Sequence, residues 1–160
     1  MEGLRIRPME PREAGQVSAL IGRVLLEVNI RDYPYEDLME FARYYSPETV
    51  LSLVEAGGHV YVAVREGELL GCGSVVPLEG RSGECEIRAV FVRPDMEGKG
   101  VGRRLMEELE ADPLFTGADR VVVSASLTAH EFYSKLGYRY QGGVKVCEDN
   151  DHYWMEKIHG

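Results

Sequence analysis

Glycines alternate with basic residues in the segment EGKGVGRR, which covers positions 97–104. The segment follows an apolar stretch that ends at Val92 and precedes apolar residues at helical spacing. The first turn of a helix presents unpaired backbone N–H groups and the positive end of the helix dipole, which together favour an anion. The glycines would let a phosphate approach the backbone, and Lys99, Arg103 and Arg104 could add charge-assisted hydrogen bonds.

Two familiar phosphate motifs do not fit this glycine turn. The nucleotide P-loop needs Ser or Thr after Gly-Lys, whereas Gly100 follows Gly98-Lys99 here. A dinucleotide fingerprint that begins at Gly98 or Gly100 places Arg103 or Leu105 where the third glycine belongs. Because glycines are common near helix starts, the turn alone could also be merely structural.

Two side chains, a carboxyl group and a phenol, could move protons. Glu86 lies in the apolar strand that leads to the turn, and Tyr133 lies in the segment HEFY. A carboxylate can accept a proton from an ammonium group, whereas a phenol with a pKa of about 10 stays protonated at neutral pH and can donate. Alternatively, Glu86 is a partly solvated residue paired with Arg88 or Arg5, and Tyr133 packs between helix and core.

We expect neither a metal site nor a nucleophilic thiol. The segment HEFYS begins like the zinc motif His-Glu-x-x-His but has Ser134 in the last place, and the other histidines are scattered. Cys72, Cys85 and Cys147 have no metal-like spacing and no nearby His in a recognisable arrangement. Structural thiols in a reducing compartment are the better interpretation.

Hydrophobic periodicity predicts the elements that position these residues. The first part of the chain should form a strand at 4–7, helices over 17–28 and 38–45, and a helix from Ser46-Pro47 to Gly57-Gly58. A hairpin around Glu66-Gly67 follows, then a strand over 84–92, a helix over 101–109, a strand over 120–126, a helix over 127–137 and two closing strands within 138–158. This order predicts a mixed α/β sheet. Regular alternation would place Glu86, Arg88, Val90 and Val92 on one face of their strand.

Composition favours one domain over residues 1–160, with a core large enough to fold without disulfides. The net charge of −9 argues against a nucleic-acid partner and favours cationic or amine ligands. No segment approaches the roughly 20 apolar residues that a membrane helix needs, and the N-terminus has no apolar run. We therefore expect a cytoplasmic protein without a membrane partner.

Two motifs in register resemble the GCN5-related N-acetyltransferase (GNAT) superfamily. The pattern Gln/Arg-x-x-Gly-x-Gly/Ala is matched by positions 97–102, with Glu97 in first place, and Asn-x-x-Ala-x-x-Phe-Tyr-x-x-x-Gly-Phe/Tyr by positions 126–138, with Ser126 in first place. The resemblance covers nearly the whole chain. It implies an α/β (α+β) single-domain fold, with a mixed central sheet of about six to seven strands flanked by helices on both faces.

The resemblance also implies an activity. The chain would transfer an acetyl group from acetyl-CoA, the acyl-donor cosubstrate, to a primary amine by direct attack in a ternary complex, without a metal. Glu86 would be the general base, directly or through water, and Tyr133 would protonate the departing thiolate. A strand bulge near 90–92 would expose an N–H to the thioester carbonyl. The residues expected to bind the cofactor are Val90, Phe91, Val92, Glu97, Gly98, Lys99, Gly100, Val101, Gly102, Arg103, Ser126, Ala129 and Phe132. The competing hypothesis is a non-catalytic acyl-CoA-binding regulatory module.

The acceptor site would be built by the N-terminal helices, the loop between them and the last hairpin. Aromatic and acidic side chains gather in that region and could hold a cationic amine, although they could equally be packing and surface residues. They are Asp32, Tyr33, Tyr35, Glu36, Asp37, Tyr44 and Tyr45. The acceptor amine could be a polyamine, an amino acid, an aminoglycoside-like compound, or a protein N-terminus or lysine. By analogy with the fold, the last strands could pair in a homodimer.

Overall fold

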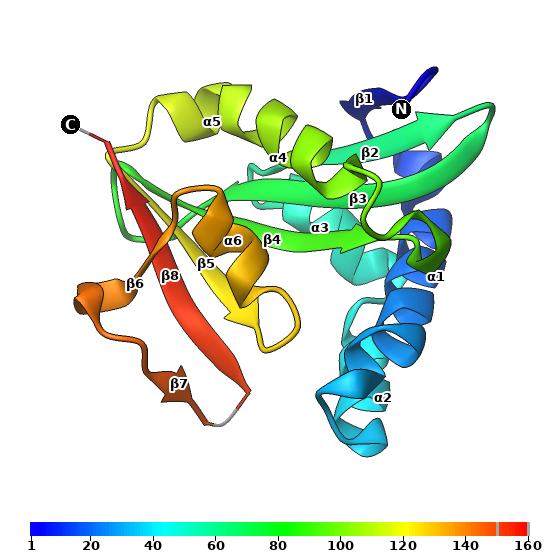
Figure 1. Cartoon of the computed structure of the whole chain (residues 1–160). Coiled ribbons are helices and arrows are strands. Elements are labelled where there is room, and N and C mark those ends of the chain that lie inside the picture. Colours follow the sequence, from blue (N-terminus) through cyan, green and yellow to red (C-terminus); the bar gives the residue numbers. More distant parts are fainter. Residues whose placement is uncertain (150, 160) are drawn as a thin grey trace.

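An open mixed sheet of eight strands forms the centre of the molecule, in the order β1-β2-β3-β4-β5-β8-β6, with β7 also paired to β8 (Figure 1). The computed structural model describes residues 1–149 and 151–159. Position 150 of the expected closing segment and position 160 of the expected domain lie outside the described residues. The strands are β1 (Arg5–Pro8), β2 (His59–Arg65), β3 (Glu68–Pro77), β4 (Glu84–Val92), β5 (Arg120–Ser126), β6 (Arg139–Tyr140), β7 (Cys147–Glu148) and β8 (His152–Ile158).

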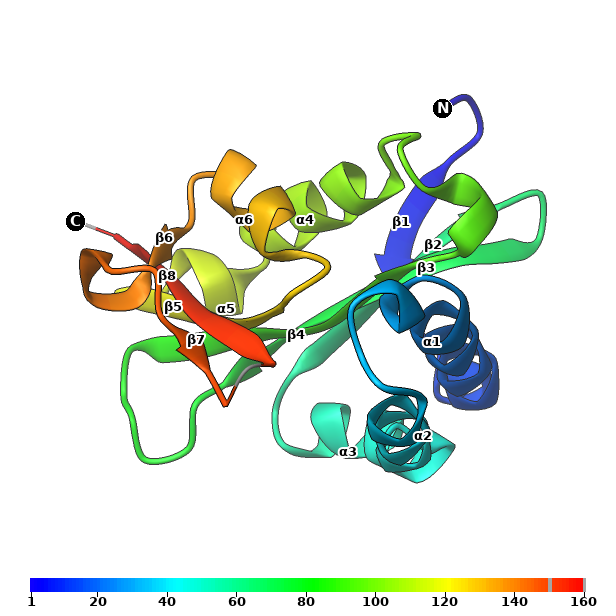
Figure 2. The same ribbon diagram turned by 60° about the horizontal axis from the view of Figure 1, so that its bottom comes forward.

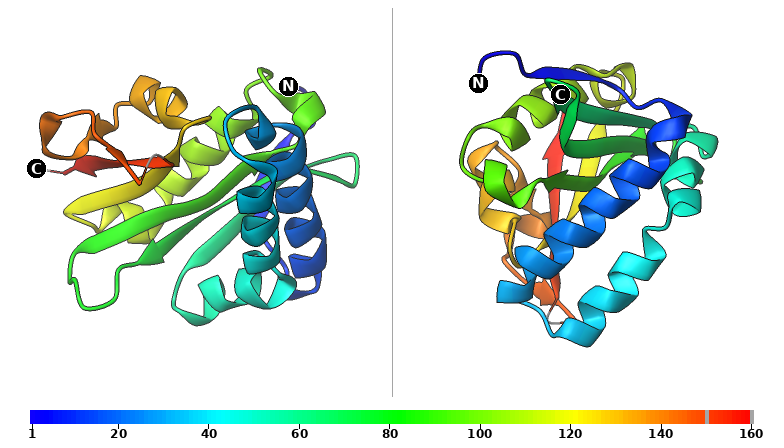
Figure 3. Two further views of the ribbon diagram at one scale, coloured as in Figure 1. Left: turned by 90° about the horizontal axis from the view of Figure 1, so that it is seen from below. Right: turned by 90° about the vertical axis from the view of Figure 1, so that its right-hand side faces the viewer.

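Helices cover both faces of the sheet, as the family resemblance implies (Figure 2). One face carries α1 (Ala14–Glu27), α2 (Tyr35–Tyr44) and α3 (Pro47–Glu55), and the other carries α4 (Val101–Ala111), α5 (Pro113–Thr116) and α6 (His130–Lys135). Figure 3 shows α1 and α2 lying side by side across the sheet. None of the described helices is both long and apolar enough to cross a membrane.

The strand count exceeds the expected six to seven because the first closing strand is interrupted. It is reduced to the two-residue strands β6 and β7, which are separated by a 3₁₀ turn over Gln141–Gly143. Gly142 and Gly143 have φ angles of 71° and 75°, in the left-handed region that glycine adopts readily. These two residues break the extended conformation, so a continuous strand cannot form there.

Two glycines in β3 let α4 pack closely on the sheet. A Cβ atom at Gly71 would lie 2.9 Å from Cδ1 of Leu105, and one at Gly73 would lie 2.9 Å from Cδ1 of Leu109. Both leucines are fully buried. A larger residue at either position would therefore push α4 outward, and with it the glycine turn at its N-terminus.

β4 pairs with β5 in parallel over only four residues, Glu84–Ile87, and the two strands then separate (Figure 1). Ala89 has φ 54°, and the β3–β4 register shifts between Cys72 and Ser74, so β4 contains the expected bulge. The bulge reverses the side-chain alternation. The prediction of one shared face is therefore wrong: Val90 and Val92 pack toward the α4 side, whereas the strand before the bulge turns Glu86 and Arg88 toward α2.

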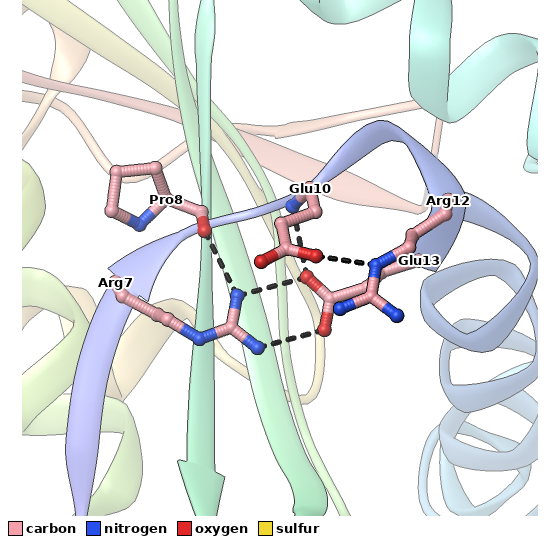
Figure 4. Close-up of polar contacts among 5 residues, drawn as sticks. All are labelled: Arg7, Pro8, Glu10, Arg12 and Glu13. Atoms are coloured by element: carbon pink, nitrogen blue, oxygen red, sulfur yellow. Dashed lines mark hydrogen bonds and ion pairs between the residues drawn. The ribbon is translucent and has the colours of Figure 1, made fainter.

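A charged cluster joins β1 to the start of α1 (Figure 4). The Arg7 guanidinium donates to both carboxylate oxygens of Glu13, each at 2.8 Å, and the backbone N–H of Glu10 donates to Glu13 at 2.8 Å. These hydrogen bonds lower the pKa of the buried Glu13 carboxyl to about 2, with the Arg7 bond as the largest cause. The cluster fixes α1 against the edge of the sheet.

We predict that Glu13→Gln lowers the free energy of unfolding by about 1–3 kcal/mol at pH 7, because the bidentate ion pair is lost. A carboxyl group whose pKa is lowered by folding stabilises the protein above its unfolded value of 4.5 and loses that effect as pH falls toward 2. Urea unfolding between pH 2.5 and 7 measures the free energy of unfolding of both proteins. The difference in this free energy between variant and wild type should shrink below about pH 4.5. Glu27→Gln, which breaks the exposed pair with Arg23, is the matched control and should cost under about 0.5 kcal/mol. A pH-independent effect of Glu13→Gln would contradict the assignment.

Candidate functional site

Two cavities occupy the opening where β4 parts from β5. The α4-side cavity, about 410 Å³, lies beside the glycine turn, the end of β4 and the segment that leads into α6. The α2-side cavity, about 380 Å³, lies among α2, β4, β5 and β8. The cavities meet at six residues that line both of them: Asn29, Val90, Phe91, Ser126, Ala129 and Tyr133. Molecules bound in the two cavities would therefore touch at this shared wall.

The glycine turn presents backbone N–H groups to the α4-side cavity. Gly98 and Gly100 have φ angles of 76° and 85°, and Gly100 caps the N-terminus of α4. A Cβ atom on either glycine would meet nothing within 4 Å, so the space beside the turn is open to a ligand. The first three N–H groups of α4, from Val101 to Arg103, have no partner within the helix and none among the described side chains. Unpaired N–H groups next to open space make an anion site.

Gly102 is needed for a different reason. A Cβ atom at this position would lie 3.2 Å from Cζ of Phe132 and 3.5 Å from Cγ2 of Val92. The missing side chain therefore lets α6 approach the first turn of α4. This contact forms one wall of the α4-side cavity.

The structure places every residue that we expected to bind the cofactor at the α4-side cavity, except Lys99. Lys99 is exposed and does not line the cavity. Glu97 forms an ion pair with Arg31, at 3.2 Å and 3.3 Å, and both side chains are exposed. The carboxylate thus pairs with an arginine 66 positions away in the sequence.

The α4-side cavity also contains residues that sequence reasoning missed. They are Val24, Val28, Asn29, Met96 and Thr128. Val24 and Val28 fit the apolar stripe of a helix, so nothing in the sequence separates them from ordinary core positions. Asn29 is 7% exposed, follows α1 directly and lines both cavities. The sequence signal that could have pointed to Asn29 is a polar residue just after an amphipathic helix.

Glu86 and Arg88 line the α2-side cavity and are both partly buried. Burial raises the pKa of the Glu86 carboxyl above its ordinary value, and the charge of Arg88 opposes this shift. Glu86 forms no ion pair within 4.0 Å with any described residue, which excludes the expected alternative of a pair with Arg88 or Arg5. Its carboxylate is therefore available to a ligand.

Tyr133 is both a core residue and a cavity residue. It is 5% exposed, and its ring makes edge contacts with Phe132 and Tyr138 at centroid distances of 5.3 Å and 5.7 Å. Its hydroxyl has no hydrogen bond to any described residue. Burial raises the pKa of the Tyr133 phenol, so the group stays protonated at neutral pH. The structure thus brings Glu86 and Tyr133, 47 positions apart, to one cavity.

Part of the expected aromatic and acidic group lines the α2-side cavity. Tyr33, Asp37, Tyr44 and Tyr45 contribute to it, together with the unexpected Phe41 and Trp154. Tyr35, Asp32 and Glu36 do not line it.

The loop before α2 is tied to the segment that follows β5. Asp32 accepts a hydrogen bond from Thr128 Oγ1 at 2.8 Å. The Tyr33 hydroxyl accepts one from the Leu127 N–H at 2.8 Å and donates to the Asp151 carbonyl. This loop therefore crosses the opening beside both cavities.

The cysteine thiols lie outside the two cavities. Cys72 and Cys85 are buried, and burial raises their thiol pKa to about 12 and about 11. None of the three cysteines lines either cavity. Among the residues that the structure describes, no group of His, Cys, Asp and Glu is arranged to hold a metal ion.

Comparison with known proteins places this architecture in a family. The model of the acetyltransferase (GNAT) domain matches residues 56–140. An IAA acetyltransferase from Azospirillum brasilense is 30% identical over 84 residues, which are 51% of this chain and 54% of that protein. The match thus spans about half the length of that curated relative.

Solved structures share the fold over almost the whole chain. A GCN5-related N-acetyltransferase from Rhodopseudomonas palustris has a TM-score of 0.79 at 24% identity, covering 99% of this chain and 98% of that one. A PaiA N-acetyltransferase from Thermoplasma acidophilum, in complex with coenzyme A, has a TM-score of 0.81 at 17% identity, covering 98% and 99%. The domain match covers more than half of the sequence and contains Glu86, the glycine turn and Tyr133. The chain belongs to the GNAT acetyltransferase family.

Proposed function

We propose that the protein is an acetyl-CoA-dependent N-acetyltransferase in which the acceptor amine attacks the thioester directly within a ternary complex. The observation that carries the proposal is the meeting of the two cavities at one wall. The anion site opens into the α4-side cavity, and the Glu86 carboxylate lines the α2-side cavity. Tyr133 borders both cavities. Donor and acceptor could therefore be bound side by side.

The donor would bind in the α4-side cavity. Its diphosphate would accept hydrogen bonds from the unpaired N–H groups at the start of α4. Beyond Ile87, the edge of β4 has no pairing to β5, so the pantetheine arm could add to it through backbone hydrogen bonds. The bulge at Ala89 would leave a backbone N–H near Val90 to polarise the thioester carbonyl.

The acceptor would react from the α2-side cavity. Glu86, directly or through water, takes one proton from the acceptor's ammonium group, and the free nitrogen then attacks the thioester carbon, so that a C–N bond forms and the C–S bond breaks. The nitrogen releases its second proton to solvent, and the Tyr133 hydroxyl gives its proton to the departing sulfur. Return of those protons through solvent gives an amide, free CoA thiol and one net proton.

A covalent acyl-enzyme is the less favoured route. A thiol nucleophile must reach the thioester as a thiolate. The cysteines lie outside both cavities, and the two buried ones have a raised thiol pKa. Direct attack needs no such group.

The activity is tested by the release of free CoA thiol from acetyl-CoA with a panel of amines. The panel should include polyamines, amino acids, aminoglycosides and peptides. Release that depends on one class of amine supports the proposal. Tight binding of CoA by calorimetry, with no release for any amine, would instead support the regulatory module.

We predict that Tyr133→Phe lowers kcat by about 100-fold, because the leaving sulfur loses its proton donor. The Kd for acetyl-CoA should change by less than about twofold, since the ring and its packing are retained. Steady-state kinetics and calorimetry measure the two quantities. Tyr35→Phe, at an exposed tyrosine outside both cavities, is the control and should leave kcat unchanged. An unchanged kcat for Tyr133→Phe would remove this residue from the mechanism.

We expect kcat/KM to rise with pH through an acid limb that lies above the ordinary glutamate pKa, because burial raises the pKa of Glu86 and only its ionised form is a base. The other charged groups at this cavity are Asp37 and Arg88. Glu86→Gln should remove this limb, shift the profile to higher pH and lower kcat/KM about 10- to 100-fold at pH 7. Profiles between pH 5 and 10 with one amine make the test, with the exposed Glu107→Gln as control. If the pH profile of Glu86→Gln is identical to that of the wild type, bulk water takes the proton.

A further inference from the structure

Arg88 is a partly buried cation without an anionic partner. Among the residues that the structure describes, its only side-chain hydrogen bond is donated to the Tyr44 hydroxyl at 3.0 Å, and no carboxylate lies within 4.0 Å. A guanidinium group has five N–H donors in a planar fork that matches a carboxylate. Because a partly desolvated charge is costly unless it is paired, the free donors of Arg88 mark a place for an anion.

The anion would belong to the acceptor rather than to coenzyme A. Arg88 lines the α2-side cavity and does not line the α4-side cavity, where the glycine turn lies. The bulge at Ala89 separates Arg88 from the glycine turn, because Arg88 before it faces the α2-side cavity whereas Val90 after it packs against the α4-side core. A phosphate at the glycine turn would therefore lie in the other cavity.

Glu86 and Arg88 present opposite charges on one face of β4. Two residues apart on a strand, their Cα atoms are about 6.6 Å apart, and their side chains point the same way. They do not form an ion pair with each other. Such a free carboxylate and free guanidinium complement the ammonium and the carboxylate of one small molecule. Asp37 is solvent-exposed, so it attracts a second cationic group more weakly.

The remainder of the α2-side cavity is largely apolar. Leu38 and Tyr45 are buried there, and Phe41 and Trp154 complete the wall. These side chains would contact an apolar or aromatic group, which gains free energy on leaving water. A polyamine or an aminoglycoside has no such group and no carboxylate.

Building on the proposed function, we propose that the acceptor is an amine that also carries a carboxylate and an apolar side chain, as an apolar α-amino acid does. Arg88 binds the carboxylate. The amine then lies toward Glu86 and the shared wall, and the side chain lies against the aromatic residues of α2 and β8.

Matched pairs of acceptors test this assignment. L-leucine, L-phenylalanine and L-tryptophan are each compared with the amine that lacks the carboxylate, and spermidine is included. Wild-type kcat/KM should be at least about 10-fold higher for the best amino acid than for its decarboxylated partner. Arg88→Met should reduce kcat/KM for the amino acid at least about 10-fold and change the decarboxylated amine less than about threefold.

Control variants separate the lost charge from a damaged fold. Arg81→Met removes an exposed arginine outside both cavities and should leave all acceptors unaffected. If Arg88→Met does not fold, Arg88→Gln takes its place, because it keeps a polar partner for Tyr44. It should show the same selective loss of kcat/KM for the amino acids. The proposal is overturned if spermidine or a decarboxylated amine equals the amino acids in the wild type, or if both Arg88 variants weaken all acceptors equally.

A binding measurement distinguishes failure of this proposal from failure of the proposed function. The N-acetyl amino acid and its carboxamide are titrated by calorimetry into protein saturated with CoA. Preference for the carboxylate that disappears in Arg88→Met supports the site even if no thiol is released with any amine. Turnover of amines without any carboxylate preference keeps the acetyltransferase and rejects the site. Absence of both binding and preference also rejects it.

Discussion

The separation of β4 from β5 is the constraint on which the rest of the site depends. The two strands are parallel neighbours up to Ile87 and then diverge, so the end of β4 keeps an unpaired backbone edge. In a fully paired sheet, the space of both cavities would be filled by strand contacts. The bulge at Ala89 adds a second effect, because it shifts the side-chain alternation, so that Glu86 and Arg88 before it face the α2-side cavity whereas Val90 after it packs on the α4 side. One strand thereby serves both cavities.

The helices that flank this gap are held by features far from the chemistry. Close packing of α4 on Gly71 and Gly73 sets the position of the glycine turn. The Arg7–Glu13 cluster fixes the first turn of α1, and the end of the same helix leads to Asn29 at the shared wall. The Arg31–Glu97 pair then connects that end of α1 with the glycine turn. Changes at any of these positions would alter the cavities without touching a ligand.

The sequence predicts the local features of this site well and the tertiary ones poorly. The glycine turn and the helix start after Gly100 could be predicted because both are encoded within a few residues. The face of Val90 could not be predicted, because the bulge depends on the register with β3 and on the lost pairing with β5. The ion-pair partner of Glu97 could not be predicted because it lies 66 positions away. The interruption between β6 and β7 depends on two glycines, and a glycine pair is equally typical of an ordinary loop.

We propose that the first backbone N–H groups of α4 bind the diphosphate of coenzyme A. This binding is tested most directly by following backbone amide chemical shifts in ¹⁵N-labelled protein during titration with coenzyme A and, separately, with pantetheine, which lacks the diphosphate. We predict large shifts from Gly98 to Arg103 with coenzyme A that are absent with pantetheine. Saturable binding of coenzyme A that leaves these amides unchanged, or equal shifts with pantetheine, would contradict it.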